Sequence, residues 1–269
     1  MPELIEVEYY RRALDPTIGQ QLASVAVSPE AFIRPSGTPV AAFDHLRGTR
    51  LAATRRHGKL LVLELADDGG PVGEIGLRFA MTGRLLIDGV GPIDRLEYSS
   101  ARNDAAWDRA ILQFDARVSV RDQRRLGSIE IDPDTTGLGL NAETIDEATW
   151  TTICSRRHKS IKAVLLDQSL AAGLGNLLSD EVLWRSHIDP RHIASELDVA
   201  AIGRLSEQVP IVVAELTARG GSHTGDSFAL RAEGEQCTIC GHSMRHDTVA
   251  TRSTWWCSGH QRQRATVTE

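Results

Sequence analysis

The last part of the chain carries three of its four cysteines, together with a histidine, at regular intervals. Cys237 and Cys240 are separated by two residues, and Cys257 and His260 repeat that separation after an interval of sixteen residues. The pattern C-x2-C-x16-C-x2-H has the number, the types and the spacing of ligands found in a structural zinc site. Because four protein ligands leave no coordination position for a catalytic water, the pattern predicts one structural Zn²⁺ that folds a short segment of chain.

Few other residues compete for this role. His242 and His246 lie between the two pairs and are alternatives to His260, although neither forms a two-residue pair with Cys257. Cys154 stands alone in an amphipathic segment, so we expect it in the apolar core. Four cysteines are too few for a disulfide framework in 269 residues. No apolar run reaches the roughly 18 to 20 residues of a membrane span, and the chain start lacks signal-peptide features, which predicts a cytoplasmic protein.

The formal net charge of −6 argues against a protein that binds polyanions over its whole surface. The basic residues are nevertheless grouped, and one group, from Arg47 to Lys59, contains five of them and no acid. The other groups are Arg117, Arg121, Arg124 and Arg125; Arg156, Arg157, Lys159 and Lys162; and, near the C-terminal end, Arg245, Arg252, Arg262 and Arg264. Any one group is typical of a solvated face, but several in one chain favour a surface that follows a phosphate backbone.

Apolar periodicity divides the chain into a β-rich first half and a helical second half. Residues 3–14 have the pattern of a helix that stops at Asp15-Pro16, and short alternating segments follow as far as residue 131. After the aperiodic stretch 132–139, helical patterns cover about 142–155, 161–170, 176–186 and 197–219. We therefore predict an α+β multidomain protein, with three domains: an N-terminal helix plus β-sandwich in 1–132, a helical domain in 141–222, and a zinc-binding segment in 235–264.

Residues 171–176 join two of the helical patterns. Gly173 and Gly175 permit positive φ and the close approach of another backbone, and Asn176 can cap the helix that follows. One interpretation is an ordinary turn between helices, which spacing alone favours. The other is a helix-turn-helix-like element whose backbone N–H groups and Asn176 amide bind a phosphate.

Several motifs together resemble the formamidopyrimidine-DNA glycosylase/endonuclease VIII family of base-excision repair enzymes. The N-terminal MPELIEVE, residues 1–8, resembles the family's MPELPEVE, and residues 160–176, from SIKAVLLDQ to GLGN, resemble its helix-two-turn-helix. RSTWWC, residues 252–257, resembles its zinc-finger hairpin. This likeness spans nearly the whole chain and implies a bifunctional DNA glycosylase and AP lyase, with a helix-two-turn-helix in the helical domain, a C-terminal zinc-finger β-hairpin, and DNA in a basic cleft between the domains.

The resemblance implies that the processed N-terminus is the nucleophile. Removal of Met1 would expose the secondary amine of Pro2, which would attack sugar C1′, displace the damaged base and form a Schiff base. The strand would then break by β- or β,δ-elimination. Glu3 would act as a general acid or base on the ring oxygen or the leaving base. The structural alternative is that Pro2 and Glu3 are merely a favourable helix start.

Four further residues match catalytic or DNA-contacting positions of the family. Lys59 matches the lysine assigned to DNA binding and to proton donation during β-elimination. Arg252 matches the finger arginine assigned to phosphate binding and δ-elimination. Asn176 matches the phosphate ligand of the helix-two-turn-helix, and Arg157 matches a basic DNA contact. For each of them the alternative is an exposed, solvated side chain.

A glycosylase that acts on duplex DNA must extrude a nucleotide and fill the gap that it leaves. Met81 matches the first residue of the family's wedge, and Arg124 and Leu126, within DQRRLG at 122–127, match the other two in the family's DPRRFG. Leu126 replaces a phenylalanine, which keeps an apolar wedge but weakens stacking on the opposite base. Met81 and Leu126 are alternatively core residues of a strand. Trp107 stands where a DNA-contacting histidine is typical.

The stretch between Gly221 and Cys237 comprises only residues 222–236. Family members that excise 8-oxoguanine carry a considerably longer stretch there, with a loop that closes over the flipped base. The preferred lesion therefore stays open among 8-oxoguanine, formamidopyrimidine, oxidised pyrimidines and abasic sites. The expected partner is double-stranded DNA with damaged bases or abasic sites, bound by a nucleoid-associated monomer that contacts no membrane. The rival from another class is a non-catalytic protein that recognises DNA damage through the same phosphate contacts.

Overall fold

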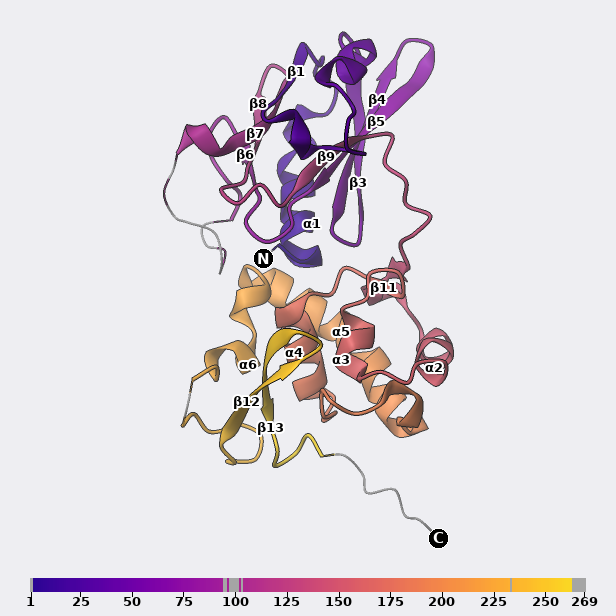
Figure 1. Ribbon diagram of the computed structural model, residues 1–269, viewed down its shortest axis with the longest axis vertical. Helices are drawn as coiled ribbons and strands as arrows, with labels where there is room; N and C mark the ends of the chain where they lie inside the picture. Colours follow the sequence, from indigo (N-terminus) through magenta and orange to yellow (C-terminus); the bar gives the residue numbers. More distant parts are fainter. Residues whose placement is uncertain (1, 94–95, 97–101, 103, 233, 263–269) are drawn as a thin grey trace. The chain divides into compact units, whose positions relative to one another are not determined.

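The computed structural model describes residues 2–93, 96, 102, 104–232 and 234–262 (Figure 1). The chain forms two compact units, residues 1–137 and residues 138–269. The C-terminal hairpin lies in the second unit, together with five of the six α-helices that the structure describes (Figure 1). The predicted end of the zinc-binding segment, residue 264, lies outside the described residues. No helix in the described part of the chain is long and apolar enough to cross a membrane.

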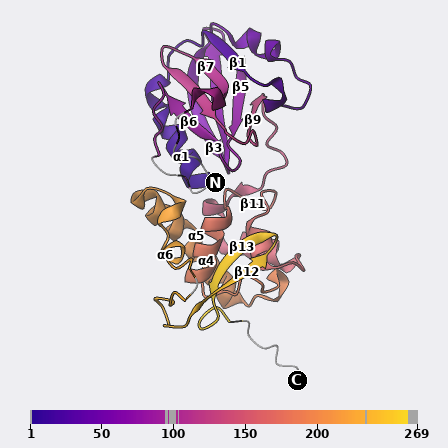
Figure 2. The same cartoon turned by 60° about the vertical axis from the view of Figure 1, so that its left-hand side comes forward.

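The described part of the first unit contains one α-helix, α1 (Leu4–Ala13), and two sheets (Figure 2). One sheet has the strand order β2 (Ile33–Arg34), β9 (Ser128–Ile131), β5 (Gly70–Arg78), β4 (Leu60–Asp67) and β3 (Arg50–His57). The other has the order β1 (Ser24–Val27), β7 (Asp108–Gln113), β8 (Arg117–Arg121) and β6 (Arg84–Ile87). Within these two sheets the described pairings are antiparallel, except that β2 is parallel to β9. The predicted β-sandwich with an N-terminal helix is confirmed.

A single apolar core joins the helix to both sheets. Val7, Tyr10 and Leu14 are spaced three and four residues apart, so they share one face of α1, and each is fully buried in this core. The helix packs against β3 and β4, and the Tyr10 ring lies 4.6 Å from that of Phe79 at the end of β5. Burial of the whole apolar face fixes α1 on the sandwich and thereby fixes its N-terminal end.

The second unit is built on helices α2 (Glu147–Ser155), α3 (Ile161–Leu165), α4 (Asn176–Arg185), α5 (Val199–Arg219) and α6 (Asp226–Ala229). Side-chain caps begin three of them: Asp146 accepts from the Thr149 amide, Ser160 from Ala163 and Asp198 from Ala201. The helix predicted over 161–170 ends at Leu165. The reason is local, because the Asp167 carboxylate accepts hydrogen bonds from the Ser169 N–H and hydroxyl and closes a turn.

Two short strand pairs complete this unit. β10 (Leu140–Asn141) pairs in parallel with β11 (Ala171–Ala172), and β12 (Met244–Val249) forms an antiparallel hairpin with β13 (Arg252–Cys257). Ala250 and Thr251 form the hairpin turn and both have positive φ, as a two-residue turn of this kind requires. Because neither is glycine, this turn stores backbone strain directly before Arg252. α4 packs against β13 and carries the hairpin.

Candidate active site and metal centre

The N-terminal end of α1 is capped by two buried acids. The Glu3 side chain accepts from the Glu6 backbone, and the Glu6 carboxylate accepts from the Glu3 amide at 2.8 Å. Both glutamates are at most 1% exposed. A carboxylate is favoured at this end of a helix by the backbone dipole, so the capping box explains how two acids can be buried here. It also holds Glu3 rigidly beside Pro2, which is itself buried.

Lys59 lies in the two-residue turn between β3 and β4, after Gly58, which has a φ of 55°. It therefore stands at the tip of a hairpin, at the strand end where the sequence placed it. The turn is tied to its neighbours because Arg56 donates to the Gly58 carbonyl at 2.9 Å and forms an ion pair with Glu8 of α1 at 3.5 Å. Within the first unit, Arg56 thus connects the turn that carries Lys59 to helix α1.

Two of the three predicted wedge residues meet in the structure. The Arg124 guanidinium lies 3.8 Å from the sulfur of Met81, although the two residues come from loops after β8 and β5. Leu126 is 47% exposed, which agrees with a wedge and argues against a core residue. Met81 is partly buried.

Asp122 organises this loop, a role that the sequence analysis missed. Its fully buried carboxylate accepts from the backbone amides of Arg124, Leu126 and Gly127 at 2.7–3.1 Å, and from the Thr82 hydroxyl. The signal in the sequence was a single acid at the head of a run of basic residues. Trp107 lies beside the same loop, since its carbonyl accepts from the Asp122 amide at 2.9 Å.

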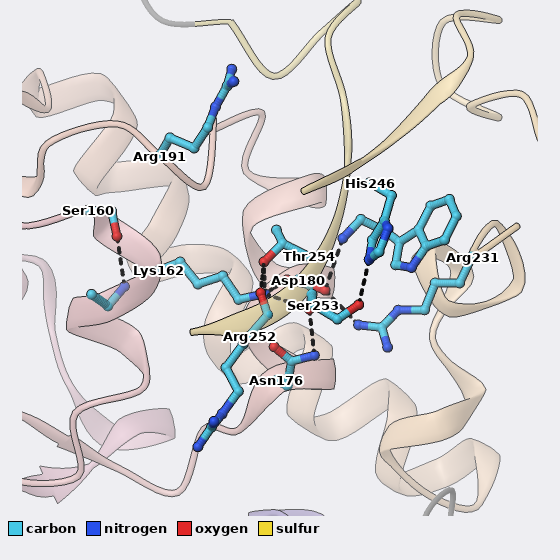
Figure 3. Close-up of polar contacts among 12 residues, drawn as sticks. Ser160, Lys162, Asn176, Asp180, Arg191, Arg231, His246, Arg252, Ser253 and Thr254 are labelled. Carbon is cyan, nitrogen blue, oxygen red and sulfur yellow. Dashed lines mark hydrogen bonds and ion pairs between the residues drawn. The ribbon is translucent and has the colours of Figure 1, made fainter. Parts of the chain in front are cut away.

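In the second unit, Asn176 lies beside the start of β13, the strand end that Arg252 and Ser253 form (Figure 3). Arg252 is exposed and begins the strand, and Ser253 follows it. The prediction that Asn176 caps α4 is wrong, because Gly175 occupies the cap position. The Asn176 side chain instead donates to the Ser253 carbonyl at 2.9 Å and leaves its own carbonyl oxygen buried without a hydrogen bond. The long-range contact with the hairpin replaces the local cap.

Arg157 lies apart from these contacts. It is partly buried after the C-terminal end of α2, and its guanidinium contacts the Arg156 carbonyl at 3.3 Å.

Several of the clustered basic residues are buried or paired with acids, so fewer of them are available to a phosphate backbone than the sequence predicted. Lys162 is completely buried, and Arg121 is 8% exposed and paired with Asp108 at 2.6 Å, so the expectation of a phosphate-facing role is wrong for both. Arg55 bridges Glu64 and Glu74 on neighbouring strands at 3.0 and 2.6 Å. These partners come from distant parts of the sequence, which is why the clusters alone did not predict them.

The predicted metal cluster is confirmed as a cluster of side chains. One ligand atom from each of Cys237, Cys240, Cys257 and His260 lies within 4.8 Å of the others. Individual separations are 3.3 Å between the sulfurs of Cys240 and Cys257, and 3.4 Å from the Cys237 sulfur to His260 Nδ1. A tetrahedral Zn²⁺ with ligand distances of about 2.0–2.3 Å places its ligand atoms roughly 3.3–3.8 Å apart. The four residues therefore fit this ion.

The surroundings of the cluster favour the same ligand set. His260 Nε2 lies 3.1 Å from the Trp184 carbonyl, which selects the tautomer that leaves Nδ1 free to bind a metal. His242 Nδ1 lies 3.3 Å from the Cys240 carbonyl, His246 stacks on Trp255, and the cluster of four ligand atoms includes His260 and neither of these two histidines. A hydrogen bond from the His242 amide lowers the pKa of Cys240 to about 6, whereas burial raises the pKa of Cys257 to about 11. A bound dication favours the thiolate form of both.

Two family models match the chain with little gap between them. Residues 1–129 match the N-terminal domain of formamidopyrimidine-DNA glycosylase, and residues 131–227 match its H2TH domain. Among curated proteins, the formamidopyrimidine-DNA glycosylase of Cupriavidus pinatubonensis is 31% identical, with 96% of this chain and 99% of the relative aligned. That of Mycolicibacterium gilvum is 30% identical, over 96% of this chain and 97% of the relative.

Solved structures give the same result. The Lactococcus lactis enzyme bound to abasic-site DNA aligns with a TM-score of 0.80 at 25% identity, and its complex with Fapy-dG DNA with 0.81 at 25%. Both alignments cover 97% of this chain and all of the other. The fold and its motifs thus define a DNA glycosylase of the helix-two-turn-helix class. The chain belongs to the formamidopyrimidine-DNA glycosylase family, and the resemblance found in the sequence is confirmed.

Proposed function

We propose that the protein is a bifunctional DNA glycosylase and AP lyase of base-excision repair. It acts at the nucleoid on double-stranded DNA that contains damaged bases or abasic sites. The observation that carries the proposal is the start of α1, where a fully buried Glu3 is held next to Pro2 in a chain that belongs to this family. A protein that only binds DNA needs no N-terminal amine, so the presence of Pro2 and Glu3 together with Lys59 and Arg252 favours an enzyme.

In the proposed reaction, removal of Met1 exposes the Pro2 amine. The amine nitrogen forms a bond to C1′, the bond from C1′ to the base breaks, and the base leaves with a proton. Glu3 supplies or accepts the proton that base departure and sugar opening require. Opening of the C1′–O4′ bond, with that proton delivered to O4′, leaves the iminium. Transfer of a C2′ proton to water then forms the C2′=C3′ bond, breaks the C3′–O bond and releases the 3′-phosphate, which cuts the strand. We assign proton donation in this second stage to Lys59.

The remaining assignments concern DNA binding. Arg252 and Asn176 bind phosphate groups, and Arg252 also assists δ-elimination. Met81, Arg124 and Leu126 fill the gap left by the extruded nucleotide, with Trp107 beside them and Arg157 as an outer basic contact. Asp122 holds Arg124 and Leu126 in place through their backbone amides, so it is a positioning residue for this wedge.

Borohydride trapping on a duplex with one abasic site tests the proposal against its rival. An enzyme of this kind forms a Schiff base that borohydride reduces to a stable covalent adduct, and it nicks the strand in the absence of reductant. A damage-binding protein without catalysis retains the duplex in a binding assay and gives neither an adduct nor a nick. That second result would overturn the proposal.

The cluster of three cysteines and His260 holds one structural Zn²⁺ in this proposal. We expect His260→Ala to weaken metal affinity by more than the roughly 10- to 100-fold that loss of an outer-shell partner costs. DNA affinity should fall with it, because the metal folds the hairpin that carries Arg252. Metal content by atomic absorption and binding to abasic-site DNA measure the two effects. His246→Ala is the matched control, since His246 is exposed on the same hairpin and should leave one Zn²⁺ per chain. Full metal content in His260→Ala would assign the fourth position to another ligand.

The short stretch 222–236 leads to a prediction about specificity. In the structure it begins with a short 3-10 turn, Ser222–Thr224, and α6. A capping loop that reads the edge of a flipped purine provides hydrogen-bond donors, and a site without them discriminates poorly. We expect excision of 8-oxoguanine opposite cytosine to be at least roughly tenfold slower than cleavage of an abasic site. Both substrates need single-turnover conditions at one salt concentration, because phosphate contacts make affinity salt-dependent. Equal rates would show that the short stretch is no handicap.

A further inference from the structure

A buried network of ion pairs lies next to Asn176 and the start of β13 in the second unit (Figure 3). Lys162 of α3 forms an ion pair with Asp180 of α4 at 2.5 Å, and the two side chains are 0% and 1% exposed. Arg231, which follows α6, binds the other oxygen of the same carboxylate at 2.6 Å and is 10% exposed. Three segments that are distant in sequence therefore meet at one carboxylate.

The same network holds β13. The Lys162 ammonium donates to the Thr254 hydroxyl at 2.6 Å and lies 3.4 Å from the Ser253 carbonyl. Asp180 also accepts from the Trp255 amide at 3.5 Å. The three residues that follow Arg252 are thus each bound to the network, and Ser253 is the residue that Asn176 contacts as well.

Stability alone explains such an arrangement poorly. Removing two cations and a carboxylate from water carries a large desolvation cost, and their mutual attraction only roughly offsets this cost. Buried ionic groups do, however, fix one register and one geometry where apolar residues would allow several. In this protein the ionic network fixes the position of β13 against α3 and α4.

The segment that supplies Arg231 is itself fastened to α4. Glu181, which is 1% exposed, accepts from the backbone amides of Asp226 and Ser227 at 3.2 and 2.8 Å and caps α6. Leu230 is buried in a small apolar cluster with Trp184 and the metal-binding cysteines. The described part of 222–236 is therefore held in place as part of the second unit.

We propose that Asp180 and Arg231 are positioning residues which, through Lys162, fix β13 on the helix-two-turn-helix and so determine where Arg252 meets a DNA phosphate. The segment after α6, which supplies Arg231, then stabilises the position of Arg252 through this network. This inference rests on the proposed function, because it assumes that Arg252 binds DNA.

Arg231→Met tests the inference with little disturbance, because it leaves the Lys162–Asp180 pair with balanced charge. We expect it to weaken binding to a duplex with a tetrahydrofuran abasic-site analogue by roughly tenfold. The slope of log affinity against log salt should also fall in magnitude by up to about one, as expected if one phosphate contact is lost. Arg231→Lys should restore most of the affinity, since it keeps a cation. Arg219→Met is the matched control, because Arg219 pairs with Asp226 at the surface of the same region at 2.7 Å.

A double-mutant cycle separates positioning from general damage to the fold. In an Arg252→Ala background, Arg231→Met should cost less than about twofold, because the contact that it positions is already absent. The same tenfold loss in both backgrounds, or no loss in either, would overturn the inference. If Arg231→Met loses zinc or unfolds, Thr254→Val takes its place in the cycle, because it removes the hydroxyl that Lys162 binds. An equal loss of affinity in both backgrounds, or no loss in either, would again overturn the inference.

Borohydride trapping with the wild-type protein shows whether the positioning role or the proposed function has failed. If it forms no borohydride adduct, the proposed function fails. If it forms the adduct while the cycle is additive, only the positioning role of Asp180 and Arg231 fails.

Discussion

Blocking the amine of residue 2 should nearly abolish covalent trapping on abasic-site DNA. Two changes do this in different ways: retention of Met1 moves the terminal amine away from its site, and Pro2→Gly replaces the secondary amine by a primary, more mobile one. We expect the rate of adduct formation to fall on the order of 10²-fold or more in each, because retained Met1 turns the Pro2 nitrogen into a non-nucleophilic amide, and the glycine amine, although still nucleophilic, is no longer held in position to attack C1′.

DNA binding should persist in both variants, since residue 2 is not part of the phosphate contacts. Affinity for a tetrahydrofuran duplex therefore serves as the internal reference. Pro16→Gly is a matched control, because it removes a proline of the same unit from a surface turn without changing the N-terminus. Undiminished trapping in both N-terminal variants would move the nucleophile to a lysine, with Lys59 the first to test.

Glu3→Gln should separate the two stages of the reaction. Base removal requires a proton transfer at the leaving base or the ring oxygen, and general acid–base catalysis contributes typically 10²- to 10⁴-fold. A preformed abasic site has no base to release, so its cleavage should fall by less than about tenfold. The measurement compares single-turnover rates on a damaged-base duplex and on an abasic-site duplex.

Glu6→Gln controls for the structural part of this effect. Glu6 is buried in the same capping box, and the amide of glutamine retains an acceptor for the Glu3 backbone. Loss of its charge should therefore change the rates on both substrates by the same factor. If Glu3→Gln also lowers the two rates equally, Glu3 stabilises the helix start and has no separate role in base release.

Local patterns in the sequence predicted what depends on local spacing. The four metal-binding residues come in two pairs whose two-residue spacing brings the ligands of each pair near one another, and the β12–β13 hairpin then brings the two pairs together. The sandwich also follows from alternation along single strands. The early end of α3 was missed although its cause is local, because apolar periodicity does not register the side-chain bonds of Asp167.

Contacts between distant segments could not be predicted in this way. Lys162 was grouped with neighbouring basic residues as a phosphate contact, but Asp180 and Thr254 bury it completely. Asn176 was expected to cap its own helix, but its side-chain amide instead donates a hydrogen bond to the Ser253 carbonyl of the hairpin. Asp122 acts through backbone amides of its own loop, and its burial depends on how the loops after β5 and β8 pack.

Peptide mapping of the reduced adduct tests the central claim most directly. The protein is trapped on an abasic-site duplex with borohydride, the DNA is digested to the sugar remnant, and the modified peptide is identified by mass spectrometry. We predict that the remnant is attached to the amine of Pro2 in a peptide that has lost Met1. A remnant on the peptide that contains Lys59 would contradict the assigned nucleophile, and retained DNA binding with no modified peptide would identify a protein that binds damage without catalysis.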